Sequence, residues 1–362
     1  MVPARCPPFI GGTESHVADV SERLVRLGHR ITVLTTDPAR RAVDRREENG
    51  VTVVRVPARK LWRDVYVAAQ LPRHVALEAP DLVHVQGYHT LIAPMAMRAA
   101  STAGIPYVVS FHSGGHDSRV RRAVRPVQRR LLRSALRRAV RLVAVSEFER
   151  RMFARSLGPT PAEITVIPTG VADEFIQADR THVDVNLIVS VGRLVEYKGH
   201  RLLIEALPHV RRVHPAARLR ILGQGDDRDA LLALAGRLGV GDAVEISYVP
   251  AGDRAALAGE LGRAAVAVFL SSYESQGIAG YEAVAAGARA VIARGTALEE
   301  LACFPGVCLV DRGDQPALVD SIVTQLAAPP LDARPMVPRL EETAGRLEKL
   351  YFEVLGAERA SD

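Results

Sequence analysis

The stretch Ser271–Gly287 has a composition that suits a ligand carrying both phosphate and hydroxyl groups. It follows Ala264–Leu270, a short apolar run with β-branched residues that is typical of a buried parallel strand. Gly277 interrupts the chain, and the small and apolar residues from 278 to 286 predict a helix that packs on a sheet. The first N–H groups of a helix lack intrahelical partners and the helix dipole is positive there, so this helix start favours an anion.

Two glutamates flank the predicted helix start. Glu274 lies on the loop that leaves the strand, and Glu282 lies about one turn inside the helix. Carboxylates at these positions could accept hydrogen bonds from hydroxyl groups on either side of a bound phosphate. A ligand with hydroxyls at both ends and phosphate between them is a sugar nucleotide. The alternative is that both glutamates are ordinary surface carboxylates.

Two cations follow another predicted strand, in Val191-Gly-Arg-Leu-Val-Glu-Tyr-Lys-Gly199. Arg193 leaves the strand and Lys198 precedes the next helix, so both could bind one phosphate group. Arginine can contact two oxygens at once, whereas lysine acts as a point charge. Lys198 is one of only three lysines in a chain that otherwise uses arginine. The alternative is a pair of solvated cations.

Histidines end two predicted strands of the first half, where ligands bind in doubly wound sheets. His112 lies in Val108-Val-Ser-Phe-His-Ser-Gly-Gly-His116 beside two glycines, which favours a functional role over a structural one. His116 is the second candidate in that loop. His84 and His89 end another strand and could line an acceptor pocket or form a packed polar rim.

Two glycines, Gly11 and Gly12, precede a helix pattern whose apolar stripe runs from Val17 to Leu27. They would let backbone approach a ligand at the helix start, although many strand-to-helix turns carry two glycines for steric reasons. A strand before them is nearly absent, which suggests a truncated strand or a start a few residues late.

Strands alternate with helices along the whole chain, as in doubly wound parallel sheets. The strands predicted in the first half are Ile31–Thr35, Val51–Val56, Leu82–Gln86, Tyr107–Phe111, Leu142–Ser146 and Ile164–Ile167. Those predicted in the second half are Asn186–Val191, Leu219–Leu222, Val244–Tyr248, Val266–Leu270, Ala290–Ala293 and Val307–Val310. The sequence therefore predicts an α/β fold with two Rossmann-like domains, residues 1–178 and 179–336. A helix within 337–362 is expected to cross back toward the first domain.

Length and composition exclude several classes of protein. A chain of 362 residues fits about two domains, and 48% hydrophobic residues is ordinary for a soluble α/β protein. No apolar run approaches the roughly 20 residues needed to cross a bilayer, and no secretory signal is evident. Cys6, Cys303 and Cys308 have neither paired nor metal-like spacing, which favours a cytoplasmic protein.

The most basic stretch runs from Arg119 to Arg141 and contains ten arginines. Its apolar residues recur at helical spacing: Val120, Val124, Val127, Leu131 and Ala135. One amphipathic helix or two are expected, and basic helices of this kind bind anionic membrane surfaces. The alternative is a helix docked on its own sheet with its arginines in water. Nucleic-acid binding is not expected, because the stretch has no aromatic residues and no recognised binding module accompanies it.

Taken together, these segments resemble retaining glycosyltransferases of family 4, which have the GT-B fold of two Rossmann-like domains facing across a cleft. The resemblance covers nearly the whole chain. It is carried by Pro8-Phe-Ile-Gly-Gly-Thr-Glu14, Phe111-His112, Val191-Gly-Arg-Leu to Lys198-Gly199, Ile221-Leu-Gly-Gln-Gly225 and the pair Glu274 and Glu282. Two positions depart from the family pattern, since an aromatic residue is frequent at Gln276 and asparagine at Thr169.

The resemblance implies roles for the charged candidates. Arg193 and Lys198 would hold the donor diphosphate. Glu282 would bind the ribose hydroxyls, and Glu274 would bind hydroxyls of the transferred sugar. His112 would contact that sugar near the reacting centre.

The resemblance also implies contacts made partly through backbone. Gln276, Gly277 and Ile278 would contact the sugar or the phosphates. Gly12 would approach from the other domain, and Val249 would border the base.

The implied reaction moves a hexose-type sugar from a UDP- or GDP-sugar to an acceptor hydroxyl with retention of the anomeric configuration. No metal or cofactor is expected, because Arg193 and Lys198 can replace a metal. The one Asp-x-Asp triplet, Asp227-Arg-Asp229, is interpreted as a helix start. A lipid-linked saccharide, the aglycone of a secondary metabolite and a soluble cyclitol all remain open as acceptors. Alternative functions are a GT-B sugar-nucleotide epimerase, a phosphorylase and a non-catalytic sugar-nucleotide-binding protein.

Overall fold

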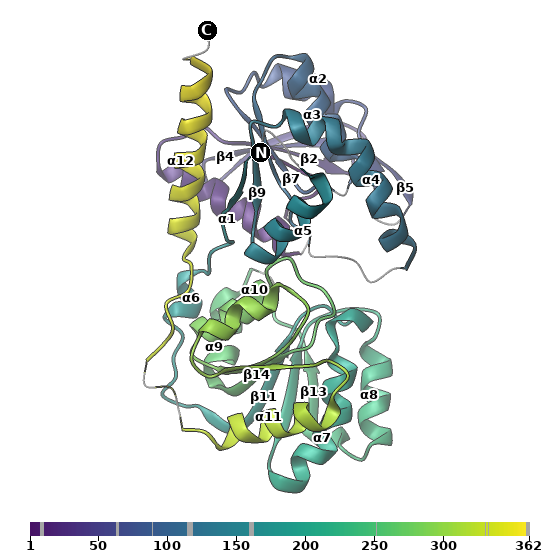
Figure 1. Ribbon diagram of the computed structural model, residues 1–362, viewed down its shortest axis with the longest axis vertical. Helices are drawn as coiled ribbons and strands as arrows, with labels where there is room; N and C mark the ends of the chain where they lie inside the picture. The colour runs from purple at the N-terminus through teal and green to yellow at the C-terminus, as the bar shows by residue number, and fades with distance from the viewer. Residues whose placement is uncertain are drawn as a thin grey trace. The chain divides into compact units, whose positions relative to one another are not determined.

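The chain folds into two compact units (Figure 1). The first unit contains Met1–Thr169 and Leu340–Asp362, and the second contains Gly170–Arg339. The computed structural model describes residues 1–7, 11–62, 65–88, 90–113, 119–158, 163–250, 252–329, 331 and 333–359, with the backbone alone at 62, 65, 119–126 and 357–359. Each unit is built on a parallel sheet with helices, which confirms the predicted α/β class.

Five parallel strands form the main sheet of the first unit, in the order β1-β7-β8-β9-β10. They are β1 Val2–Pro3, β7 Val83–Gln86, β8 Tyr107–Ser110, β9 Arg141–Ala144 and β10 Ile164–Val166. All residues of β7 and β8 are buried, as expected for parallel strands covered on both faces. The short first strand pairs with β7, and the backbone of Met1 binds the next strand of the chain through Thr32 and Leu34, at 2.6 and 2.9 Å.

A second sheet of three strands lies in the same unit, in the order β2-β4-β3. Its strands are β2 Thr32–Asp37, β3 Asp44–Glu48 and β4 Val51–Pro57. The antiparallel β3 was not predicted, because its sequence Asp-Arg-Arg-Glu-Glu carries no apolar periodicity. A two-stranded hairpin of β5 Arg59–Trp62 and β6 Val65–Val67 follows and was also not predicted.

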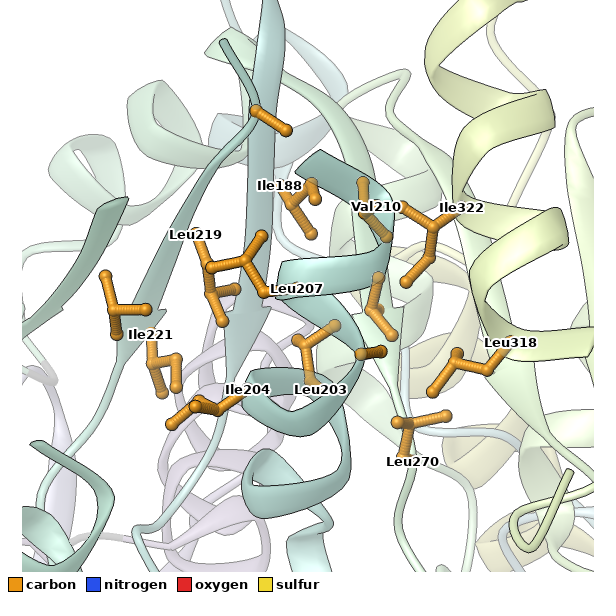
Figure 2. Close-up of a cluster of buried hydrophobic side chains, with 14 of the residues drawn as sticks. Ile188, Leu203, Ile204, Leu207, Val210, Leu219, Ile221, Leu270, Leu318 and Ile322 are labelled. Carbon is orange, nitrogen blue, oxygen red and sulfur yellow. The ribbon is translucent and has the colours of Figure 1, made fainter. Parts of the chain in front are cut away.

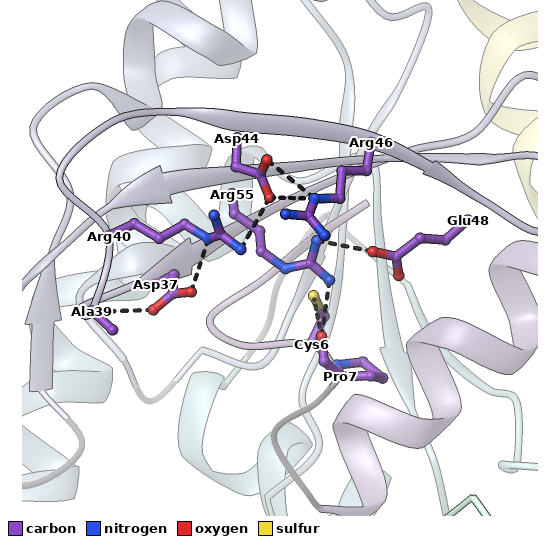
Figure 3. Close-up of polar contacts among 9 residues, drawn as sticks. All are labelled: Cys6, Pro7, Asp37, Ala39, Arg40, Asp44, Arg46, Glu48 and Arg55. Atoms are coloured by element: carbon purple, nitrogen blue, oxygen red, sulfur yellow. Dashed lines mark hydrogen bonds and ion pairs between the residues drawn. The ribbon is translucent and has the colours of Figure 1, made fainter.

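Strand β3 has no apolar residue and is held by its backbone pairing with β4 and by ion pairs. The guanidinium of Arg55, on β4, is nearly buried and contacts Glu48 on β3 at 3.0 Å and the carbonyl oxygen of Pro7 at 3.0 Å (Figure 3). Asp44 contacts Arg40 and Arg46 at 3.1 and 3.0 Å. These contacts tie the edge strand and the segment before α1 to the sheet.

Six helices of the first unit are described: α1 Gly12–Arg26, α2 Leu71–Leu77, α3 Ile92–Thr102, α4 Arg119–Arg138, α5 Glu147–Leu157 and α12 Leu340–Arg359. The last helix, α12, lies beside α1 (Figure 1). Its Leu347, Leu350 and Val354 pack with Val20 of α1 and with Val108 of β8 in one buried cluster. The C-terminal helix is therefore part of the hydrophobic core of the first unit.

The second unit has six parallel strands in the order β13-β12-β11-β14-β15-β16. They are β11 Asp184–Val191, β12 Arg218–Leu222, β13 Val244–Ser247, β14 Ala264–Phe269, β15 Arg289–Ala293 and β16 Val307–Val310. Strand order reverses between β11 and β14, and ligands of open α/β sheets bind at the carboxyl ends of strands at such a point.

The described helices of the second unit are α6 Asp173–Ile176, α7 His200–Val213, α8 Arg228–Arg237, α9 Arg254–Arg263, α10 Ile278–Ala285 and α11 Gln315–Ala327, with 3-10 turns η1 Glu196–Lys198, η2 Gly241–Ala243 and η3 Ala297–Cys303. Figure 2 shows the core on one face of the sheet. Leu203 and Leu207 of α7 meet Ile188 of β11, while Leu318 and Ile322 of α11 extend the cluster. This apolar layer fixes the start of α7, which follows Lys198 and Gly199.

Helix α4 is a single helix, but two members of the expected apolar stripe, Val127 and Leu131, do not dock. Val127 and Leu131 are 57% and 77% exposed, whereas Leu136 is fully buried. Leu132 and Ala135 pack partly against the core. No helix among the described ranges is long and apolar enough to span a bilayer.

Three buried histidines make the stability of the fold depend on pH. Burial lowers the pKa from 6.5 to about 4 for His16, to about 3 for His84 and to about 4 for His200. Each is therefore neutral in the folded protein, whereas in the unfolded chain it takes up a proton near pH 6.5. We expect the contribution of these three rings to the free energy of unfolding to be complete above pH 6.5 and to fall by several kcal/mol toward pH 4, since one pKa unit corresponds to about 1.4 kcal/mol.

Urea denaturation at pH about 7 and about 5 measures this dependence. His84→Gln should reduce the pH dependence, because it removes one of the three buried rings. A wild-type free energy of unfolding that does not change over this range would contradict the neutral state of the three buried rings.

Candidate functional site

The two loops that the sequence singled out in the second unit follow β11 and β14, the strands on either side of the strand-order reversal. They are joined directly. Tyr197 and Tyr273 stack with ring centroids 4.2 Å apart, and the Ser272 N–H donates to the Tyr197 carbonyl oxygen at 2.8 Å. The loops therefore form one surface at the carboxyl edge of the sheet.

Lys198 and Glu274 meet on this surface. The Lys198 Nζ donates to Glu274 Oε1 at 2.5 Å, and the two side chains are only 18% and 17% exposed. Partial burial makes such a pair less screened than an ion pair in water. The pair holds an ammonium and a carboxylate in fixed, adjacent positions.

Arg193 lies on the same aromatic ring as Lys198. Its guanidinium donates to the Tyr197 hydroxyl at 2.7 Å and its Cζ lies 5.8 Å from the centre of the Tyr197 ring. The Lys198 Nζ lies 5.5 Å from the same ring. Both cations therefore lie next to Tyr197, each within cation–π distance of its ring.

Glycines bring the ends of β11 and β12 close together. The Gly192 N–H donates to Leu222 at 3.0 Å, and a Cβ on Gly223 would lie 1.9 Å from the Gly192 carbonyl oxygen. Only glycine fits at position 223. The Gly223 N–H in turn donates to Ser247 of β13 at 2.8 Å, and Val249 follows two residues later, half-buried.

Helix α10 begins where the sequence predicts, directly after Gly277, whose φ of +81° favours glycine. Gln276 is buried and Ile278 half-buried at this start, and Glu282 is half-buried within the helix. The N–H groups of the first helical turn have no acceptor within the helix and point outward at this end. The structure therefore brings a helix start, two cations and Glu274 to one edge of one sheet.

Two positioning residues were missed by sequence reasoning. The His200 Nε2 donates to the Arg193 carbonyl oxygen at 3.3 Å, so in the neutral ring Nδ1 accepts from the Ser190 hydroxyl at 3.2 Å. Arg312, after β16, donates to the carbonyl oxygens of Leu270 and Glu196 at 2.9 and 3.3 Å. Arg312 joins both loops from a distant part of the sequence, whereas His200 holds only the loop after β11, through partners 7 and 10 residues away.

In the first unit, His112 lies at the end of β8 in a left-handed backbone conformation, with φ of +48°. A non-glycine residue in this region is strained, and such strain persists where neighbouring contacts hold it. The His112 Nε2 lies 2.7 Å from Gln86 Oε1, which can only accept, so Nε2 donates. The His112 ring also lies 5.2 Å from the ring of His16.

Glu149 fixes the backbone beside His112. It is fully buried, and its carboxylate accepts from the backbone N–H of Ser113 and from that of Val145 at 2.8 Å. Burial raises the pKa of Glu149 to about 7, although the two donors act in the opposite direction. This carboxylate connects the loop after β8 to the start of α5 and was not predicted to matter.

His84 is buried and hydrogen-bonded on both ring nitrogens, which supports the packed alternative. It is 3% exposed, with Nδ1 2.6 Å from the Tyr351 hydroxyl and Nε2 2.8 Å from Ser110 Oγ. It connects α12 to the sheet. His89 and His116 lie outside the described residues.

The remaining candidates lie at helix starts or turns. Gly12 is exposed at the first residue of α1. Asp227 precedes α8 and Asp229 lies in its first turn with a 98% exposed side chain, as a helix-start carboxylate would. Within the described part of the chain, no group of three or more His, Cys, Asp or Glu residues could hold a metal ion.

Two family profiles match consecutive parts of the chain. Glycosyltransferase Family 4 matches residues 10–175, and Glycosyl transferases group 1 matches residues 172–335. Glycogen synthase of Mycobacterium tuberculosis is 30% identical over 309 residues, which are 78% of this chain and 74% of that protein. The gpi3 subunit of phosphatidylinositol N-acetylglucosaminyltransferase of Schizosaccharomyces pombe is 29% identical over 228 residues, which are 60% of this chain and 49% of that protein.

Solved structures have the same fold at low sequence identity. A glycosyltransferase from Rickettsia africae superposes with a TM-score of 0.75 at 15% identity and covers 98% of each chain. Anabaena HepE, solved in complex with UDP and glucose, superposes with a TM-score of 0.70 at 17% identity, covering 99% of this chain and 98% of that chain. These neighbours confirm the predicted GT-B fold, and with the profile matches and the mycobacterial relative they establish that the chain belongs to glycosyltransferase family 4.

Proposed function

We propose that this glycosyltransferase moves a hexose-type sugar from a UDP- or GDP-sugar to an acceptor hydroxyl, with retention of the anomeric configuration. The observation that carries the proposal is the shared surface of the second unit. Arg193 and Lys198 lie against one tyrosine ring, and Lys198 also contacts Glu274 at 2.5 Å. Cations, a carboxylate and a helix start at one sheet edge suit a diphosphate that carries a sugar.

In the proposed reaction, the bond between sugar C1 and the diphosphate oxygen breaks while the acceptor oxygen bonds to C1. Negative charge grows on the leaving diphosphate, and Arg193, Lys198 and the start of α10 stabilise it. Preorganised charge of this kind is commonly the largest contribution to catalysis. The acceptor proton goes to the leaving diphosphate, on the face from which the sugar departs, which gives retention. The reaction as proposed needs no metal.

The remaining candidate residues contact the donor in this proposal. Glu274 accepts from hydroxyls of the transferred sugar, and Glu282 accepts from the ribose hydroxyls. His112 contacts the transferred sugar. Gly12, Val249, Gln276, Gly277 and Ile278 complete the donor contacts.

We also propose a cytoplasmic location. Cys6, Cys303 and Cys308 are all free in the structure, and Cys6 is buried. Free cysteines are the usual state in a reducing compartment. Fractionation of cells that express the full chain tests this proposal directly.

Glu282 provides a test of the donor assignment. Glu282→Ala should weaken binding of the preferred UDP- or GDP-sugar about 10- to 100-fold, as expected for loss of a charged hydrogen-bond acceptor. The effect should be much smaller for an analogue whose ribose lacks both hydroxyls. Asp229→Ala is the matched control, because this carboxylate is fully solvated.

Isothermal titration calorimetry with both nucleotides and both analogues measures these affinities. Incubation with each donor and mass spectrometry of the products then separates transfer or slow donor hydrolysis from epimerisation. Equal affinities of wild type and Glu282→Ala for the intact donor would contradict the site assignment, and conversion of the donor to an epimer would contradict the reaction.

A further inference from the structure

One face of α4 is both apolar and basic and lies in solvent. Val127 and Leu131 are one helical turn apart, so they point the same way, and they are 57% and 77% exposed. The buried Leu136 and the partly buried Leu132 belong to the other face, which contacts the core of the first unit. Val127 and Leu131 therefore take no part in the packing of α4 on the first unit.

Arginines surround this exposed pair. Arg130 and Arg138 follow Val127 and Leu131 on the solvent side of the helix, and Arg133 is exposed beside them. The segment from 119 to 141 contains ten arginines and no aspartate or glutamate. On the neighbouring α5, Arg151 and Arg155 are also exposed. Long arginine side chains can reach anionic groups while aliphatic neighbours enter an apolar layer.

We propose that this face of α4 binds an anionic lipid surface, with Val127 and Leu131 entering the boundary between headgroups and acyl chains and Arg130, Arg133 and Arg138 contacting lipid phosphates. Two aliphatic side chains are far too small an apolar area for a stable protein interface of about 800 Å² on each partner. A nucleic acid would neutralise the arginines but would leave the aliphatic pair without a partner, and the segment has no aromatic residue on which bases could stack.

Co-sedimentation of the full chain with sucrose-loaded vesicles tests the proposal. We expect binding to vesicles of about one third phosphatidylglycerol in phosphatidylcholine, no binding to pure phosphatidylcholine, and weaker binding at higher salt. Leu131→Glu should lower the partition coefficient at least about tenfold, because it removes an inserted side chain and adds a repelled charge. Arg130→Glu with Arg138→Glu should lower it further and weaken its salt dependence.

Val213→Glu is the matched control. Val213 is 61% exposed at the end of α7, next to Arg211 and Arg212, but it belongs to the second unit. The Val213→Glu variant should bind vesicles as wild type does. Donor hydrolysis and melting temperature, measured for every variant, show that the fold and the donor site are intact.

Three results would overturn the proposal: equal binding to both vesicle types, unchanged binding of Leu131→Glu, or binding of an acidic protein or RNA through these residues without vesicle binding. Because the proposal does not depend on sugar transfer, a protein that binds vesicles but lacks donor activity would refute only the function proposed above.

Discussion

Replacing Lys198 with alanine is expected to lower kcat/KM for the sugar nucleotide about 10²–10³-fold, the usual loss when one preorganised donor to a developing negative charge is removed. Lys198 is 18% exposed and is held against both Tyr197 and Glu274. Its ammonium is therefore already in position before the donor arrives. Water that enters in its place must reorient during the reaction, which raises the barrier.

A variant of Glu274 distinguishes an effect on catalysis from an effect on the attraction between the protein and the charged diphosphate. In the unliganded protein its carboxylate neutralises Lys198 at 2.5 Å. Glu274→Gln keeps the shape of the side chain but removes the charge that repels a diphosphate. We expect this variant to bind the free nucleoside diphosphate at least as tightly as wild type does, while kcat with the intact donor falls.

Arg201→Ala controls for the loss of positive charge. Arg201 lies three residues after Lys198, is 71% exposed and pairs with Glu205 on the surface of α7. Its removal should change kcat/KM less than about twofold, because solvated charges are strongly screened. The catalytic role proposed for Lys198 is wrong if Lys198→Ala and Arg201→Ala have the same kcat/KM.

The parallel strands could be predicted because each is a short apolar run, and the structure has all twelve of the expected strands within a few residues. Strand β3 could not be predicted. Its five residues, Asp44–Glu48, are all charged, and ion pairs with residues such as Arg55 hold it at the sheet. A strand held by backbone pairing with β4 and by charged side chains has no apolar periodicity in its own sequence.

Helix α4 shows a different limit of prediction from the sequence. Its sequence offers two apolar stripes, one through Val127 and Leu131 and another through Leu132 and Leu136. Local periodicity cannot decide between them, because the choice depends on which stripe meets the core residues of α3 and α5. The structure buries Leu136 and part of Leu132, and it exposes Val127 and Leu131.

The candidate site was predictable where the chemistry lies at strand ends. Arg193, Lys198 and Glu274 were selected from residue type and position, and the structure brings the last two into contact. The Tyr197–Tyr273 stack joins residues that are distant in the sequence. The His200 bond to the Arg193 carbonyl oxygen joins neighbouring residues, but no motif marks it. Such supporting contacts follow from the packing and not from any motif.

Glu149 is the supporting residue with the largest expected effect. The sequence Ser146-Glu-Phe-Glu149 has the spacing of a capping box, and the Ser146 hydroxyl does accept from the Glu149 N–H at 3.0 Å. The carboxylate, however, reaches the N–H groups of Val145 and Ser113. That second contact, across 36 residues, could not be predicted from the capping pattern.

Glu149→Ala is expected to lower the free energy of unfolding by about 3 kcal/mol or more, because two buried backbone N–H groups lose their acceptor and each costs about 1–3 kcal/mol. Ser113 adjoins His112, so kcat should also fall at temperatures where the variant is fully folded. Glu147→Ala is the matched control. Glu147 lies in the same helical turn, is 41% exposed and pairs with Arg150, so its loss should cost less than about 1 kcal/mol.

The pH dependence of Glu149→Gln tests the same contact by another route. The wild-type carboxyl has its pKa raised to about 7 by burial, so its contribution to stability is complete below pH 4.5 and is lost as the pH rises through 7. Glutamine does not titrate, and its neutral amide resembles the protonated carboxyl that the wild type carries below pH 7. The free energy of unfolding of wild type minus that of Glu149→Gln, measured by urea denaturation, should therefore fall between pH 4.5 and 7. A difference that stays constant over this range would mean that the carboxyl does not titrate there and that burial does not control its charge.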